Sequence, residues 1–123
     1  MNVQTLRAQY VADFRANAAE YDDQRKALSN VLLGQGFVVV TSGNIPLRFD
    51  IDANRTVTNP LPTNTANATR FRQEDAETIA KNVTNGLGEK AEAMHIVHLL
   101  TIKAAQAREC ADQIEALIKK EVK

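Results

Sequence analysis

The chain has 123 residues, and its 15 Lys and Arg residues balance its 15 Asp and Glu residues, so the formal net charge is zero. A chain of this length is expected to form a single domain, here spanning residues 1–123. The neutral charge argues against a protein whose main task is to coat DNA or an anionic membrane. The apolar runs are far shorter than the roughly 20 residues that a membrane-spanning helix needs, and the N-terminus lacks the pattern of a signal peptide. The single cysteine, Cys110, excludes an intrachain disulfide and fits a reducing compartment.

Apolar residues recur at helical spacing from residue 3 to residue 33 and predict a long first helix. Most of them fall on one heptad stripe, which consists of Val3, Tyr10, Phe14, Tyr21, Leu28 and Val31. Gly34 and Gly36 follow, and a glycine readily takes the left-handed conformation that ends many helices. The first helix is therefore expected to end close to residue 33.

The period of the apolar pattern then changes to that of a strand. Residues 37–41 are rich in Val, and residues 45–51 alternate between apolar and polar side chains. Turn residues follow each run, and a short third strand is expected over residues 55–58. Together these runs predict a three-stranded antiparallel meander over residues 37–58, followed by an exposed connector over residues 59–68.

Two more helices are expected in the second half of the chain. Acidic residues crowd the first turn of a helix predicted over residues 73–85, where the helix dipole favours negative charge. A last helix is predicted over residues 89–121, because apolar residues recur there at alternating spacings of three and four. The middle of its apolar seam consists of Ala104, Ala107 and Ala111, whose small side chains let another helix approach closely.

These elements predict an α+β fold. The first and last helices have similar expected lengths, on the order of 45 Å at about 1.5 Å per residue. We expect them to pack antiparallel, with the bulky residues of the first helix against the alanine seam of the last. The short helix and the three-stranded antiparallel meander are then expected to pack with this pair of helices.

One segment has the pattern of a metal-binding loop. The run Asp50-Ile51-Asp52-Ala53-Asn54 matches the opening of a calcium loop, whose clustered oxygens suit a hard cation. However, Arg55 stands where that loop requires glycine, and Leu61 stands where it requires glutamate. A β-turn explains the run better, so we predict no metal there.

A second run, Glu92-Ala93-Met94-His95, would place a carboxylate and an imidazole on one face of a helix, with His98 one turn further. Di-iron bundles need two such motifs, and this chain has one copy. Cys110 lies roughly 18 Å from His98 along a straight helix and cannot complete a site within one chain. Neither a nucleophile with a neighbouring base nor a phosphate-binding glycine loop is evident. We therefore predict no enzymatic activity, metal or cofactor. A metal enzyme that uses Glu92, His95 and His98 is kept as an alternative.

Charged residues of the meander and of the next helix start are the best candidates for contacts with a partner. Arg70 and Arg72 enclose Phe71, a grouping that can stack on a base or grip a phosphate but also suits an ordinary helix start with one buried ring. Because the net charge is zero, a protein partner is favoured over nucleic acid. The predicted partner-binding residues are Arg48, Asp50, Arg55, Arg70 and Arg72.

The run Thr69-Arg70-Phe71-Arg72-Gln73-Glu74-Asp75-Ala76-Glu77-Thr78-Ile79-Ala80, followed by Asn85-Gly86, resembles a pattern in small phage and prophage proteins of unassigned role. In those proteins a short meander precedes a helix start of the form T-R-F-x-x-x-D-A, usually with Thr or Ser directly before the helix, where this chain has Arg72. The resemblance spans residues 37–88. Long helices on a small antiparallel sheet are also similar to the architecture of some phage anti-CRISPR proteins, a likeness that transfers no site residues.

The resemblance implies a phage or prophage accessory protein that acts by binding a macromolecular partner, and inhibition of a host defence system is the specific activity to test first. The alternative is a structural or assembly component of a virion that self-associates through its long helices. Either role implies a location in the host cytoplasm or in the virion, without a membrane partner. A homo-oligomer is expected under the alternative.

Overall fold

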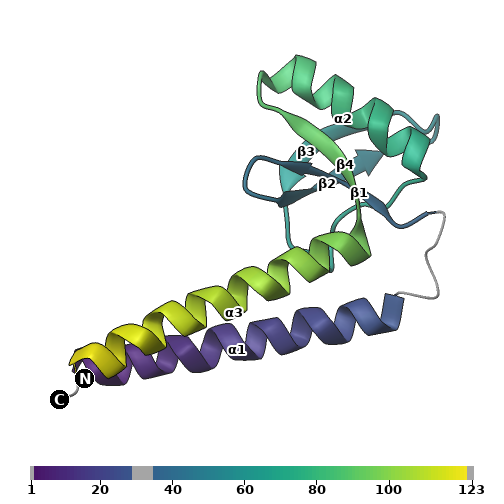
Figure 1. The fold of residues 1–123 in the computed structure, drawn as a ribbon. Helices are drawn as coiled ribbons and strands as arrows, with labels where there is room; N and C mark the ends of the chain where they lie inside the picture. Colours follow the sequence, from purple (N-terminus) through teal and green to yellow (C-terminus); the bar gives the residue numbers. More distant parts are fainter. Residues whose placement is uncertain (1, 29–34, 122–123) are drawn as a thin grey trace. The chain divides into compact units, whose positions relative to one another are not determined.

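The computed structural model describes residues 2–28 and 35–121. Within these residues the chain forms, in order, α1 (Val3–Leu28), β1 (Phe37–Thr41), β2 (Ile45–Ile51), β3 (Val57–Pro62), α2 (Gln73–Leu87), β4 (Ala91–His95) and α3 (Ile96–Glu121) (Figure 1). The described residues divide into two compact units, one of residues 2–28 and 100–121 and the other of residues 35–99. The expectation of a single domain over residues 1–123 stays a prediction.

The first unit is an antiparallel pair of long helices, α1 and most of α3 (Figure 1). Ala104, Ala107 and Ala111 of α3 are buried, and so are Val11 and Ala18 of α1. Small side chains therefore form the buried contact on both helices. The prediction that the two long helices pack antiparallel, with the alanine seam of the last helix buried, is confirmed.

The apolar stripe expected on the first helix was wrong in the N-terminal half of α1, where the buried position lies one residue later than predicted. Val3 and Tyr10 are exposed, and the neighbouring Val11 is buried in their place. The physical reason is that α3 presents a narrow seam of alanines as its buried face. It leaves room for small side chains such as Val11 and Ala18 at the centre of the seam and keeps large rings at its margin. The predicted end of this helix near residue 33, with Val31 and Gly34, lies outside the described residues.

A series of ion pairs favours one register of the two helices, because residues further along α1 pair with residues earlier in α3. The pairs are Arg7–Glu121, Arg15–Glu115 at 2.9 Å, Arg15–Asp112 at 3.6 Å and Asp22–Arg108. The hydrogen bond and charge of Arg15 lower the pKa of Glu115, and those of Glu115 raise the pKa of Arg15. These pairs are exposed to water, so they select the antiparallel register more than they add stability.

The second unit is built on an antiparallel sheet with strand order β3-β2-β1-β4. Val39 of β1 pairs with Ala93 of β4, and Thr41 pairs with Ile45 of β2 across the first turn. The main apolar cluster lies between this sheet and α2. Its buried members are Val39, Leu47, Phe49, Ala76, Ala80, Val83 and Ala91. The sheet has four strands where the sequence predicted a three-stranded meander.

The fourth strand is a correction to the predicted last helix. Residues 89–121 were expected to be one helix, but Ala91–His95 form β4 and the helix begins at Ile96. Ala, Glu and Met favour helix locally, yet β1 offers a complete antiparallel partner over five residues. Long-range pairing therefore outweighs local propensity here.

The third strand and the connector also differ from expectation. Strand β3 runs over Val57–Pro62 instead of 55–58, so the predicted connector over 59–68 begins as a strand. Arg55 has a φ of 61° and belongs to the turn before it. Within the connector, Thr65 and Ala68 are buried, and only part of it is exposed.

Helix α2 matches the predicted 73–85 span closely and ends at Leu87. Arg72 precedes it in an extended conformation and makes no side-chain cap, so the acidic first turn satisfies the dipole without one. Phe71 and Ala76 both join the apolar cluster, as a hydrophobic staple requires. Gly88 closes the helix with a φ of 68°, a left-handed conformation that favours glycine. No helix in residues 2–28 or 35–121 is long and apolar enough to cross a membrane.

We predict that Ala111→Leu destabilises the helical pair. Ala111 is fully buried in the seam, so three additional carbons must force the helices apart, at a cost of about 1–3 kcal/mol. Ala105→Leu is the matched control, because Ala105 is exposed on the same helix. Urea unfolding followed by circular dichroism measures both changes, and equal stabilities for the two variants would contradict the packing described.

Candidate functional site

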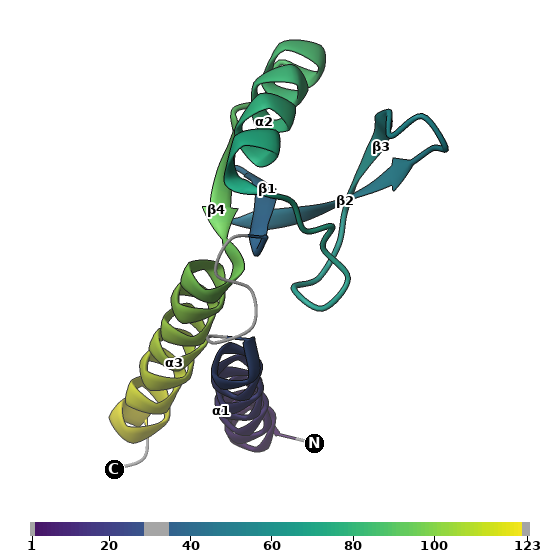
Figure 2. The same ribbon diagram turned by 90° about the vertical axis from the view of Figure 1, so that its right-hand side faces the viewer.

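Helix α2 leaves part of the sheet uncovered. Its buried residues reach Val39 of β1, Ala91 of β4, and Leu47 and Phe49 of β2. The end of β2 and most of β3 extend beyond that contact, although Val57 of β3 packs against its margin, and in Figure 2 this hairpin projects away from α2. An α-helix is about 10 Å wide and strands lie about 4.8 Å apart, so one helix covers roughly two strands.

An apolar groove lies between α2 and the β2–β3 hairpin. It consists of two adjoining hollows, of about 550 Å³ and about 530 Å³, which share Val57 and Ile79. The first is lined in addition by Ile51, Arg55, Phe71 and Asp75. The second is lined in addition by Phe49, Thr56, Pro60, Asn82, Val83, Gly86 and Leu87. We call this surface the apolar groove.

Large apolar side chains stand exposed at both ends of the apolar groove. Ile51 is 50% exposed at the hairpin end, and Leu87 is 56% exposed at the C-terminal end of α2. Below them the rings of Phe49 and Phe71 meet edge to face, with 5.8 Å between their centres. Contiguous apolar surface of this kind, in a concave shape, is characteristic of binding sites.

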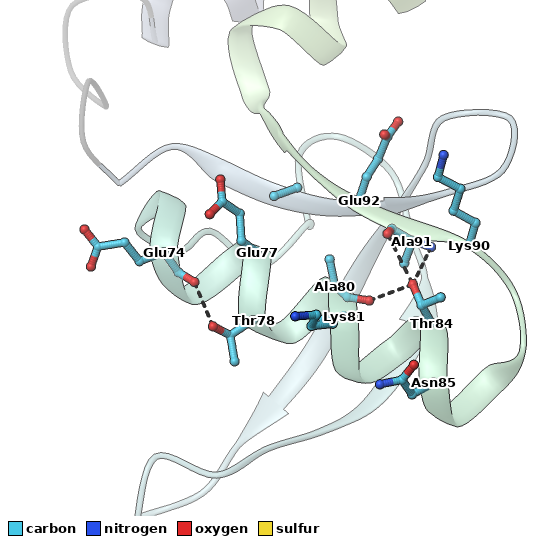
Figure 3. A pocket seen from close by; sticks show the side chains of 11 residues that line it. Glu74, Glu77, Thr78, Ala80, Lys81, Thr84, Asn85, Lys90, Ala91 and Glu92 are labelled. Atoms are coloured by element: carbon cyan, nitrogen blue, oxygen red, sulfur yellow. Dashed lines mark hydrogen bonds between the residues drawn. The ribbon is translucent and has the colours of Figure 1, made fainter.

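A separate hollow, of about 680 Å³, lies outside the apolar groove, on the other side of α2 and along β4 (Figure 3). Its rim carries charged residues of both signs: Glu74, Glu77, Lys81, Lys90 and Glu92. Its hydroxyl groups are engaged with the main chain, since Thr78 donates to the carbonyl of Glu74 and Thr84 donates to that of Ala80. The hollow therefore offers mixed surface charge and no nucleophile held against a base.

Thr84 also forms hydrogen bonds with the backbone of Ala91, the first residue of β4. Its Oγ1 accepts a hydrogen bond of 2.9 Å from the amide of Ala91, and its single hydroxyl proton is shared between the carbonyl of Ala80 at 2.9 Å and that of Ala91 at 3.3 Å (Figure 3). The amide and carbonyl of Ala91 are the backbone groups that an additional strand would use. A helix side chain thus satisfies one site of pairing at this sheet edge.

Strand β3, at the other sheet edge, carries Pro60 and Pro62. A proline has no amide hydrogen and cannot donate to a neighbouring strand. Asn59, between them and the turn, has a φ of 55°, and the register of β3 against β2 shifts nearby, between Arg48 and Asp50. Both edges therefore carry features that oppose the addition of a strand.

The structure divides the predicted partner-binding residues of the meander between two faces. Arg48 alternates with the buried Leu47 and Phe49 and projects from the opposite face of β2. The Asp50 carboxylate accepts a hydrogen bond of 2.9 Å from the side-chain amide of Asn59. Arg55, in contrast, lines the apolar groove on the α2 side.

Arg70 and Arg72 are exposed on either side of Phe71. Phe71 itself pairs with Phe37 through two backbone hydrogen bonds of 3.0 Å and 2.7 Å, and its ring lines the apolar groove. Arg55 lines the same hollow, so the fold brings Arg55 close to the segment that carries the other two arginines. Their role in binding a partner stays a prediction.

The runs with metal-site patterns serve the fold. The Asp52 carboxylate accepts the amides of Asn54 and Thr56 at 2.9 Å and 2.8 Å, so it builds the hairpin turn. Glu92 and His95 lie three positions apart on a strand, which places them on opposite faces of the sheet. Among residues 2–28 and 35–121, no group of three or more His, Cys, Asp or Glu side chains is arranged to hold a metal.

His95 occupies the junction between β4 and α3. Its Nδ1 accepts the amide of Val97 in the first turn of α3, at 3.2 Å. Its ring stands edge to face against Phe37, with 5.0 Å between the ring centres. Cys110 is partly exposed on α3. His95 thus serves to start a helix, an arrangement that the predicted helix over 89–121 did not anticipate.

Sequence reasoning missed the apolar groove because its walls are distant in sequence. The alternation over residues 45–51 did place Phe49 and Ile51 on one face. It gave no sign that α2 would cover Phe49 and stop short of Ile51. Leu87, just before Gly88, gave no usable signal by itself, because single apolar residues are common on protein surfaces.

Comparisons of this chain with protein-family models, with curated proteins and with solved structures found no match.

We predict that Thr84→Val destabilises the second unit and speeds hydrogen exchange at the amide of Ala91. The variant keeps the side-chain shape but removes the acceptor of the Ala91 amide, leaving this partly buried amide unpaired at a cost of about 1–3 kcal/mol. Thr78→Val is the control, because the Thr78 hydroxyl bonds only an exposed helix carbonyl. Exchange measured by NMR checks the prediction, and an unchanged Ala91 rate would contradict it.

Proposed function

We propose that this chain is a non-enzymatic protein that acts by binding another protein, and that the apolar groove is its contact surface. The observation that carries the proposal is the exposure of Ile51 and Leu87 above a concave apolar lining. Protein interfaces place apolar residues at the centre and charged residues at the rim. Arg55 and Asp75 stand at one end of the groove in this way.

The partner proposed first is a component of a host defence system, with the chain as a phage or prophage accessory inhibitor. The support for this version is the sequence resemblance around Thr69–Ala80 together with the small size of the chain. Inhibitors of this type act by occupying a surface, for which a groove suffices. Nucleic acid is the less favoured partner, because the net charge is zero and Arg48 projects from a different face than Arg55.

We predict that groove variants lose the partner in a pull-down from the cells that naturally produce this protein. Ile51→Glu and Leu87→Glu place a charge in the proposed interface without disturbing buried residues, since both positions are half exposed. Leu61→Glu is the matched control. Leu61 is 48% exposed and pairs with Arg48, on the sheet face opposite the groove.

The expected result is a protein recovered by the wild-type chain and by Leu61→Glu but not by the two groove variants, with circular dichroism unchanged throughout. A protein recovered equally by all four chains would place the interface elsewhere. Recovery of none at high bait concentration would count against a binding role altogether.

A second candidate function is assembly, in which copies of the chain associate through their long helices in a virion. A separate observation favours it: Val3, Leu6 and Tyr10 are exposed at spacings of three and four along α1. This stripe lies about a quarter turn away from the seam that contains Val11 and Ala18. A further helix could cover it, as in a four-helix bundle.

We predict under this second candidate that the chain forms an oligomer that Leu6→Glu together with Tyr10→Glu dissociates. The two charges would lie in the helix contact and would be costly to bury. Ala8→Glu is the control, since Ala8 is exposed on another face of α1. Light scattering over a range of concentrations decides the matter, and a monomeric wild-type chain would exclude assembly by this route.

A further inference from the structure

We infer that the pair formed by α1 and α3 opens while the second unit stays folded, so that α1 is a helix that the native protein can release. This property is separate from the apolar groove and from the binding role proposed for it. Three features of the contact between the two helices lead to it: small apolar burial, two buried polar atoms without partners, and reliance on exposed ion pairs.

The apolar contact between α1 and α3 is small for helices of this length. Among the 26 residues of α1, Val11 and Ala18 are the buried ones, and the rings of Phe14 and Tyr21 stay partly exposed. The facing side of α3 contributes the small side chains of the alanine seam. Hydrophobic stabilisation grows with the apolar area removed from water, so small side chains on both helices give a weak attachment.

Polar side chains interrupt the contact towards both ends of α1. Gln4 lies one heptad before Val11, and Arg25 lies one heptad after Ala18, so both fall on the stripe that faces α3. Gln4 Oε1 and Arg25 Nε are buried without a hydrogen-bond partner in the part of the chain that the structure describes. A buried polar atom without a partner costs free energy, which is regained when water reaches it. Opening of the helical pair therefore relieves a cost that closing imposes.

Ion pairs at the surface supply much of the remaining attraction between the helices. Arg15 lies 2.9 Å from Glu115 and 3.6 Å from Asp112, and all three side chains are at least 35% exposed. Each exposed pair adds little to stability, but several together weigh on a contact with so little apolar burial. Salt screens such pairs, since the Debye length falls from about 10 Å at 0.1 M to about 3 Å at 1 M. High salt is therefore expected to favour release of α1.

The second unit is held together differently. Residues 38–40 of β1 are consecutive and fully buried, and β1 pairs with a strand on each side. The start of α3 belongs to this unit, where the amide of Ile96 donates to the carbonyl of Gly36 at 2.7 Å and the side chain of Leu99 is fully buried. Regions with few buried apolar side chains open at a lower free energy than regions with many. Release of α1 is therefore expected without unfolding of the second unit.

Native-state hydrogen exchange of the full-length chain, followed by NMR in 0.05 M and 1 M NaCl, tests this inference. An isolated helix is only marginally stable in water, so the amides of a released α1 exchange. The amides of Val11 and Ala18 are expected to be at least about tenfold less protected than those of Val39 and Val83. They should lose a further threefold or more, roughly, at high salt, while Val39 and Val83 change less than about twofold. Equal protection and equal salt response in the two groups would show one cooperative structure and overturn the inference.

A double variant, Gln4→Leu with Arg25→Leu, tests the contribution of the two unpartnered polar atoms. It is expected to raise the protection of the Val11 and Ala18 amides at least about tenfold, because closing no longer buries those atoms. Gln9→Leu is the matched control, because Gln9 is exposed on the same helix, and it should change the protection less than about twofold. Unchanged or reduced protection in the double variant would contradict the weakness assigned to this contact and overturn the inference.

Discussion

The arrangement of the second unit follows from how α2 is seated on the sheet. Ala76, Ala80 and Val83 are small or β-branched, so they bring the helix close to Val39 and Ala91 and hold it over β1 and β4. A helix seated there cannot also reach Ile51 at the end of β2. The same contacts that form the core of this unit therefore leave an apolar surface beside it.

The edge strands of the sheet differ from the apolar groove in how far they are protected from contact with other chains. Edge strands invite uncontrolled association, and here prolines in β3 and the hydroxyl of Thr84 at β4 oppose it. The apolar groove, in contrast, has no such protection, with Leu87 standing exposed at its margin. Exposure of that residue costs free energy in water, about 25 cal/mol for each Å² left uncovered. The proposed role in binding would account for this exposed apolar surface.

The sequence alone was sufficient where local chemistry decides the structure. The Val run over Phe37–Thr41, the alternation over Ile45–Ile51 and the acidic start of α2 each predicted the observed element. The alanine seam predicted a packed helical pair, because small apolar residues at alternating spacings of three and four lie on one face of a helix. These features depend on residues within a few turns of each other.

The remaining features depend on contacts between distant residues. Ala91–His95 has a helical composition and becomes a strand only because β1 is available to pair with it. The α1 seam is centred on Val11 instead of Tyr10, because the alanines on the facing side of α3 decide which side chains of α1 are buried. The apolar groove is the clearest case, since Ile51 and Leu87 belong to separate elements and no local pattern places them on one surface. Arg55 was a predicted contact residue that the fold does bring to this surface, while Arg48 lies on the opposite face.

Methyl NMR with a soluble paramagnetic agent tests the central claim, that the surface between α2 and the β2–β3 hairpin is open and apolar in the free protein. The agent enhances relaxation of methyl groups that it can approach. The account predicts strong enhancement for Ile51 and Leu87 and little for Val39, which is fully buried in the same unit. Equal protection of all three methyl-bearing residues would mean that the surface is already covered, and would contradict the account.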